Sequence, residues 1–118
     1  MISMEISNVG VDIVNIERFR KKGYNENKKF YEKIFSKSEI QYCLSFKNNS
    51  EHFAGKFAIK EAVKKSIKEN IGFKEILTNH KKSKPQVILK KKLSYRFFVS
   101  VSHEKDYAIA MVIALNDN

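Results

Sequence analysis

The sequence contains a single cysteine, Cys43, among its 118 residues. One cysteine cannot form an intramolecular disulfide, and no Cys/His cluster has the spacing of a zinc site. We therefore expect Cys43 to be a small buried apolar residue on a helix, because free cysteine is among the most buried residue types. Neither thiol chemistry nor zinc binding is indicated.

Long apolar segments are also missing. No run approaches the roughly 20 residues that a membrane-spanning helix needs, and the opening residues MISMEISNVG lack the basic and long apolar regions of a secretory signal. No internal repeat or low-complexity linker divides the chain, and its 42% of hydrophobic residues suffices for one core. We expect one domain over residues 1–118, located in the cytoplasm and not associated with a membrane.

Positive charge is the most prominent feature of the composition. Lys and Arg number 23 against 13 Asp and Glu, which gives a formal net charge of +10. Such a charge raises the local concentration of polyanions, including nucleic acids, acidic proteins and phosphorylated cofactors. Charge alone does not select among these partners. The abundance of lysine and asparagine indicates that compositional bias accounts for part of the excess positive charge.

The hydrophobic pattern predicts helices in the first half of the chain and strands in the second. A first strand is expected over residues 5–14, and Ser36 with Glu39 matches a capping box at the start of a short helix. The other expected helices cover residues 15–22, 30–35 and 50–70, and the other strands cover residues 73–77, 86–90, 97–102 and 107–115. Helices followed by strands with short turns predict an α+β fold, in which a mainly antiparallel sheet packs around the long central helix.

Two carboxylates stand where a short globular chain would rarely place them. Asp12 interrupts the apolar run GVDIVNIER (residues 10–18), and Glu61 lies mid-helix in FAIKEAVKK (residues 57–65). If the two converge, they provide hard oxygen ligands for a divalent cation, and the surrounding lysines suit a polyphosphate. Phosphoryl-type transfer is therefore the leading hypothesis.

The lysines of the long helix allow a structural interpretation as well. Lys56, Lys60, Lys64 and Lys68 recur at steps of four residues and share one face. Glu61 and Lys65 belong to the adjacent row, where an ordinary surface ion pair would satisfy both of them. From the residues alone, this surface pair is an alternative to metal and phosphate binding.

The order of three motifs adds a family resemblance. GVDIVNIER, AGKFAIKEAVKK and SVSH (residues 100–103) make the chain similar to the holo-acyl-carrier-protein synthases, small bacterial 4'-phosphopantetheinyl transferases, from Ile6 to Leu115. The resemblance implies the fold of those enzymes and a part in fatty acid biosynthesis. The implied reaction transfers 4'-phosphopantetheine from coenzyme A to a serine of apo-acyl carrier protein, with Mg²⁺ as cofactor.

The resemblance also implies roles for particular residues. Asp12 and Glu61 would bind Mg²⁺, and Lys65 would approach the phosphates, so these three form the expected catalytic set. Lys56 and His103 would bind the 3'-phosphate of coenzyme A. Taken alone, a histidine at the end of a strand is more often a hydrogen-bonded structural residue.

Three positions depart from the family pattern. Lys56 stands where arginine is usual and lacks its planar two-pronged donor. Ser83 precedes Lys84 and Pro85 where relatives read Gly-Lys-Pro, so serine is strained if this turn requires positive φ. Lys84 and Pro85 are nevertheless expected to bind coenzyme A. Glu104 places a negative charge close to the expected phosphate. We expect the three departures to affect the affinity for phosphate.

Partners follow from the same resemblance. Arg18 matches the arginine that faces the acidic helix of the carrier protein, and Arg20 is either a second contact or part of an exposed amphipathic helix. The family further implies a homotrimer with coenzyme A clefts between adjacent protomers.

Two alternatives remain at this point. A small basic nucleic-acid-binding module would explain the charge, but the order of the motifs disfavours it, and we expect no nucleic-acid partner. A degenerate domain that only binds coenzyme A or a carrier protein is the other alternative.

Overall fold

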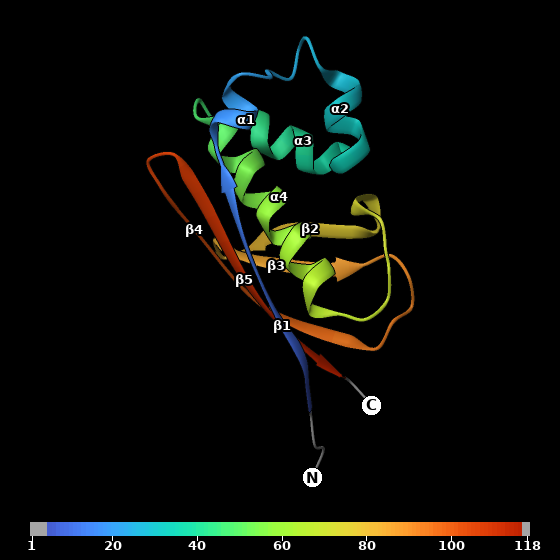
Figure 1. Ribbon diagram of the computed structural model, residues 1–118. Helices are drawn as coiled ribbons and strands as arrows, with labels where there is room; N and C mark the ends of the chain where they lie inside the picture. Colours follow the sequence, from blue (N-terminus) through green and yellow to red (C-terminus); the bar gives the residue numbers. More distant parts are fainter. Residues whose placement is uncertain (1–4, 117–118) are drawn as a thin grey trace.

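The apolar run at the start of the chain forms strand β1 (Glu5–Asn15) in the computed structural model, which describes residues 5–116. β1 pairs antiparallel with β5 (Tyr107–Asn116), which pairs with β4 (Tyr95–Glu104), so the sheet order is β1-β5-β4 (Figure 1). A second antiparallel sheet consists of β2 (Ile76–Lys81) and β3 (Lys84–Leu89). The predicted α+β fold is confirmed, with its strands divided between two sheets.

Four helices complete the fold within residues 5–116. They are α1 (Glu17–Arg20), α2 (Lys28–Ile34), α3 (Lys37–Leu44) and α4 (Asn49–Ser66). In Figure 1 the three short helices lie together at one end of the molecule, whereas the long helix α4 runs beside β1 and β5. The capping box at the start of α3 is confirmed, because Glu39 N donates to Ser36 Oγ at 3.2 Å and Ser36 N donates to Glu39 Oε1 at 2.7 Å.

Several predicted boundaries were wrong. The first helix is a single turn, although the Asn15 side chain still accepts a hydrogen bond at its start, from Glu17 N at 3.0 Å. α4 ends at Ser66 instead of residue 70, because Ile67 is extended and buried in the core. The strand expected from residue 73 begins as a 3-10 turn, η1 (Phe73–Glu75), and β2 starts only at Ile76.

The turn between β2 and β3 is tighter than predicted. Lys81 pairs with Lys84, which leaves Lys82 and Ser83 as a two-residue hairpin turn. Both have positive φ, 51° and 66°, as type I′ hairpin turns require. Serine is therefore strained at the position where the family pattern has glycine, as the sequence comparison suggested.

Small residues allow α4 to lie close against the three-stranded sheet. The inner face of β5 presents Ala108, Ala110 and Ala114, all fully buried. On β1, a Cβ added at Gly10 would lie 1.9 Å from the Ala62 carbonyl oxygen of α4. Only glycine permits this approach, which fixes the position of the neighbouring Asp12 relative to the helix.

The opposite face of the three-stranded sheet is apolar and uncovered in the single chain. Exposed side chains on this outer face come from all three strands: Val9, Val11, Ile13, Phe98, Ile109 and Met111 are 44–60% exposed. Monomeric proteins rarely expose a contiguous apolar surface of this extent.

Cys43 is buried on α3, as predicted, and burial raises the pKa of its thiol to about 12. A thiol in that state is protonated at neutral pH and a poor nucleophile. No helix in residues 5–116 is long and apolar enough to cross a membrane.

Candidate active site

Asp12 and Lys65 meet where β1 crosses the C-terminal half of α4. Lys65 Nζ donates to Asp12 Oδ1 at 3.0 Å and to the Val11 carbonyl at 3.0 Å. The Asp12 side chain is 15% exposed and that of Lys65 is 52% exposed. The contact joins the two motifs that carry the family resemblance and leaves the lysine accessible to solvent.

Glu61 lies one helical turn before Lys65, and residues four apart share a helix face. Its side chain is half-buried. Within residues 5–116, Lys65 pairs with Asp12 and not with Glu61, so the surface pair considered from the sequence does not form. Asp12, Glu61 and Lys65 therefore belong to one flank of α4.

The donor set of this flank suits magnesium. In the described part of the chain no three His, Cys, Asp or Glu side chains cluster as a metal cage would require. Two carboxylates are nevertheless what Mg²⁺ commonly takes from a protein, because it keeps waters and binds substrate phosphates at its other positions. The Lys65 ammonium beside Asp12 shows that a cation is accommodated at this carboxylate.

A pocket of about 360 Å³ lies on the other flank of α4, between this helix and residues of α3, β2 and β4. Its lining includes Lys56 and His103, the two residues predicted to bind the 3'-phosphate, and also Ser83. Lys84 and Pro85 follow Ser83 as the first residues of β3 and do not line this pocket. The structure thus brings the predicted phosphate ligands together, apart from the flank that carries Asp12.

Lys56 is almost fully buried at the edge of this pocket, with 3% exposure. Its Nζ donates to Thr78 Oγ1 at 2.9 Å and lies 4.8 Å from the centre of the Tyr42 ring. Burial lowers the pKa of Lys56 from its ordinary value. The ammonium is held in place by β2.

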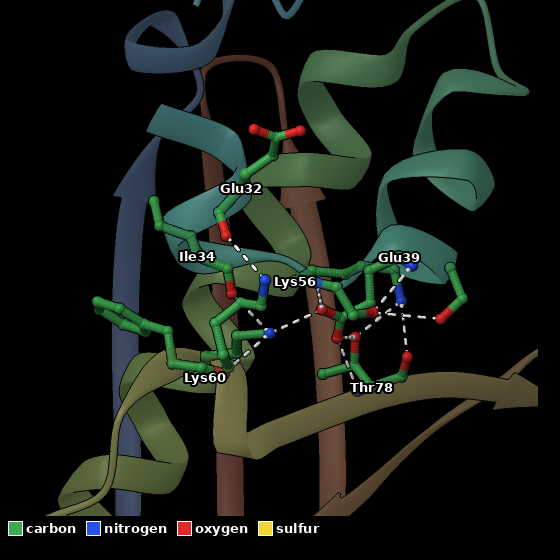
Figure 2. Close-up of polar contacts among 10 residues, drawn as sticks. Glu32, Ile34, Glu39, Lys56, Lys60 and Thr78 are labelled. Atoms are coloured by element: carbon green, nitrogen blue, oxygen red, sulfur yellow. Dashed lines mark hydrogen bonds and ion pairs between the residues drawn. The ribbon is translucent and has the colours of Figure 1, made fainter. Parts of the chain in front are cut away.

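A buried ion pair between Lys60 and Glu39 stabilises the position of Lys56 and Thr78 (Figure 2). Lys60, with no exposed surface, donates to Glu39 Oε1 at 2.7 Å, to the Ile34 carbonyl at 2.8 Å and to the Phe73 carbonyl at 3.1 Å. The second oxygen of Glu39 accepts from Thr78 N at 2.8 Å and Thr78 Oγ1 at 2.6 Å. Glu39 therefore fixes the threonine that holds the other buried lysine.

Electrostatics keep Glu39 ionised despite its burial. Burial by itself would raise the pKa of the carboxyl group, but the Lys60 charge and the hydrogen bonds from Lys60, Thr78 and Ser36 outweigh this effect. The pKa of Glu39 is therefore below its ordinary value. The sequence analysis did not predict this network. The capping box was the one sequence feature that pointed to it, because it fixes the position of Glu39 on α3.

The two arginines proposed for partner binding differ in their surroundings. Arg18 is exposed, and its guanidinium lies 5.0 Å from the centre of the Phe57 ring. Arg20 donates to Asp106 at 2.9 Å and to the Lys105 carbonyl at 3.0 Å, which ties α1 to the turn between β4 and β5. Partner binding stays a prediction for both, and for Arg20 it would require these internal contacts to open.

Comparison with known proteins identifies the family of this chain. The model of the 4'-phosphopantetheinyl transferase superfamily matches residues 8–112. The holo-acyl-carrier-protein synthase of Chlamydia felis is 40% identical, over 95% of this chain and 99% of its own length. That of Thermodesulfovibrio yellowstonii is also 40% identical, over 92% and 97%.

Solved structures give the same result. The Bacillus anthracis holo-acyl-carrier-protein synthase in complex with CoA (3',5'-ADP) superimposes with a TM-score of 0.81 at 29% identity, over 97% of this chain and 99% of that chain. The Helicobacter pylori synthase in complex with coenzyme A gives 0.78 at 33% identity, over 90% and 98%. The chain therefore belongs to the 4'-phosphopantetheinyl transferase superfamily, as an enzyme of the holo-acyl-carrier-protein synthase type.

Proposed function

We propose that this chain transfers 4'-phosphopantetheine from coenzyme A to a serine of an acidic apo-acyl carrier protein in a Mg²⁺-dependent reaction. The observation that carries the proposal is the contact of Lys65 with Asp12, with Glu61 one helical turn away. The relatives are named for this activity, and two of the similar structures contain coenzyme A or its nucleotide.

The reaction requires the serine oxygen to attack the phosphorus that carries the pantetheine. A bond forms from this oxygen to phosphorus, and the diphosphate P–O bond breaks to release adenosine 3',5'-bisphosphate, while the serine proton passes to a water molecule. Asp12 and Glu61 would hold Mg²⁺, which when bound would neutralise the oxygens of the diphosphate. Lys65 would stabilise negative charge on the phosphoryl group during transfer.

The other flank of α4 would bind the nucleotide end of coenzyme A. Lys56 and His103 would contact its 3'-phosphate, because both line the pocket and both can donate to an anion. Lys84 and Pro85 adjoin this pocket through Ser83, and their contact with coenzyme A remains a prediction. Arg18, exposed near the start of α1, would meet the acidic carrier protein.

A homotrimer would explain two features of the single chain. Its outer sheet face is apolar and uncovered, and its two sets of site residues lie on different flanks of α4. A cleft formed between protomers would combine the catalytic flank of one copy with the nucleotide pocket of another. We expect light scattering to give three copies for the wild type and fewer for Val11→Glu, whereas an active wild-type monomer would rule out the shared cleft.

The cytoplasmic location and the single domain over residues 1–118 remain predictions from the sequence.

The catalytic assignment is tested by replacing one carboxylate. Glu61→Gln keeps the size of the side chain but removes its charge, so we expect loss of transfer, measured as the phosphopantetheine mass added to apo-carrier protein. Glu32→Gln is the matched control, since Glu32 is an exposed glutamate whose carboxylate points away from the buried cluster in Figure 2. Full Mg²⁺-dependent transfer by folded Glu61→Gln would refute the assignment.

A further inference from the structure

All three histidines of the chain line the same pocket. His52 comes from α4, His80 from β2 and His103 from β4, and they meet beside the buried ammonium of Lys56. The family resemblance accounts for His103 only. The other two imidazoles have no assigned role.

His52 is held in a defined orientation next to His103. Its ring stacks on Phe46 with centroids 3.7 Å apart and an interplanar angle of 17°. The centroids of the His52 and His103 rings are 6.4 Å apart. At this separation, oxygens of one phosphate group can accept a hydrogen bond from each ring.

The surroundings of His52 favour its neutral form. Burial lowers the pKa of His52, and His103 and Lys56 lower it further, whereas Glu51 raises it. Glu51 faces the pocket, with its Oε2 3.9 Å from His103 Nδ1, and the same oxygen accepts a hydrogen bond from Asn48. Entry of an anion reverses this balance, because negative charge beside an imidazole stabilises its protonated form.

We propose that His52 is a further phosphate-binding residue of this pocket and takes up a proton when the terminal 3'-phosphate monoester of coenzyme A enters. The inference rests on the proposed function, in which Lys56 and His103 bind the same phosphate. His52 adds a positive charge only when the ligand is present. His52 therefore places no permanent second cation beside the buried Lys56.

His80 provides a contrast within the same pocket. Its ring stacks on Tyr42 with centroids 4.7 Å apart, and its Nδ1 is buried with no hydrogen-bond partner in the described residues. Protonation would leave an unpaired buried N–H group, which is costly. His80 should stay neutral, which makes His80→Gln a matched control for His52→Gln.

The test is calorimetric titration of the wild-type protein at about pH 7.5, where a phosphate monoester is mainly doubly ionised. The protein is titrated with coenzyme A and with 3'-dephospho-coenzyme A, in two buffers of different ionisation enthalpy. The difference between the ligands isolates the 3'-phosphate. We expect this group to bring uptake of about one proton, because a single imidazole changes its charge.

The variants assign that proton. His52→Gln should abolish the uptake and weaken coenzyme A binding about tenfold, the value of one charge-assisted hydrogen bond, with little change for the dephospho ligand. His80→Gln should retain the uptake. Equal proton counts for the two ligands with wild-type protein, or uptake that persists in His52→Gln, would overturn the inference while coenzyme A binding still stands. If wild-type protein binds neither ligand, the proposed function fails as well.

Discussion

Lys60 and Lys65 lie little more than one turn apart on α4, yet their surroundings are opposite. Lys60 has no exposed surface and donates to three oxygens, those of Glu39, Ile34 and Phe73. Lys65 has a half-exposed side chain and donates to two oxygens, both on β1. Their spacing places them in adjacent rows of the helix surface but does not show that one is buried and the other exposed.

The number of hydrogen bonds suits the two lysines to different roles. A lysine ammonium has three donors, so Lys60 is fully satisfied and can only hold segments together. Within residues 5–116 Lys65 donates two hydrogen bonds, which leaves one donor for a ligand, and its contact with Asp12 is accessible to water. A group that stabilises charge during phosphoryl transfer must be able to reach the phosphate, whereas a group that fixes a scaffold need not.

Removal of the buried lysine should give the largest effect. Lys60→Met leaves the Glu39 carboxylate buried without its charged partner, so we expect the free energy of unfolding to fall by about 3–5 kcal/mol. Urea denaturation followed by circular dichroism measures this change. The double variant Lys60→Met with Glu39→Leu should recover much of the loss, because no unpaired charge remains. A loss below about 0.5 kcal/mol for the single variant, within the usual range for surface substitutions, would show that the pair is not needed.

Replacement of the exposed Lys65 should change stability little and transfer activity strongly. Lys65→Met breaks a solvent-accessible pair and should change stability by less than about 1 kcal/mol. Transfer activity should fall by about 10²–10³ in kcat, as when one preorganised donor to a transition state is removed. Lys68→Met, an exposed lysine beyond the end of α4, is the control for general loss of charge. Unchanged kcat in Lys65→Met would remove this residue from the catalytic set.

Sequence patterns predicted the elements that depend on local chemistry. The capping box of α3, the apolar strand around Asp12 and the buried cysteine were all found as expected. The strain at Ser83 was also predictable, because only the residue type and the turn were needed. The end of α4 was not, since burial of Ile67 in the core decided it against a continued helical pattern.

The spacing of the lysines on α4 did not predict which of them are buried. Lys60 is buried because oxygen acceptors arrive from α2, α3 and η1, segments that are distant in the sequence. Likewise, the gathering of His52, His80 and His103 depends on how α4, β2 and β4 pack. Motif order identified Asp12 and Glu61 as candidate catalytic residues, whereas the Glu39–Lys60 network required the tertiary structure.

Acid titration gives the smallest expected difference between the buried Glu39–Lys60 pair and the exposed Asp12–Lys65 pair. Because the pKa of Glu39 is lowered in the folded protein, its stabilisation is fully present above the pKa of the unfolded chain and is lost as pH falls through the folded value. Wild-type stability, measured by urea denaturation, should therefore decline in the acid range, and Glu39→Gln should have a flatter profile.

Salt distinguishes the contribution of the buried Glu39–Lys60 pair to stability from that of the exposed Asp12–Lys65 pair. Raising NaCl from about 0.1 M to about 1 M shortens the screening length from roughly 10 Å to 3 Å, which weakens exposed pairs far more than buried ones. The acid-dependent difference between wild type and Glu39→Gln should persist at high salt, whereas the small stability effect of Lys65→Met should vanish. If salt removed the Glu39 difference, water would have access to the Glu39–Lys60 pair, and the contrast between the two lysines would be lost.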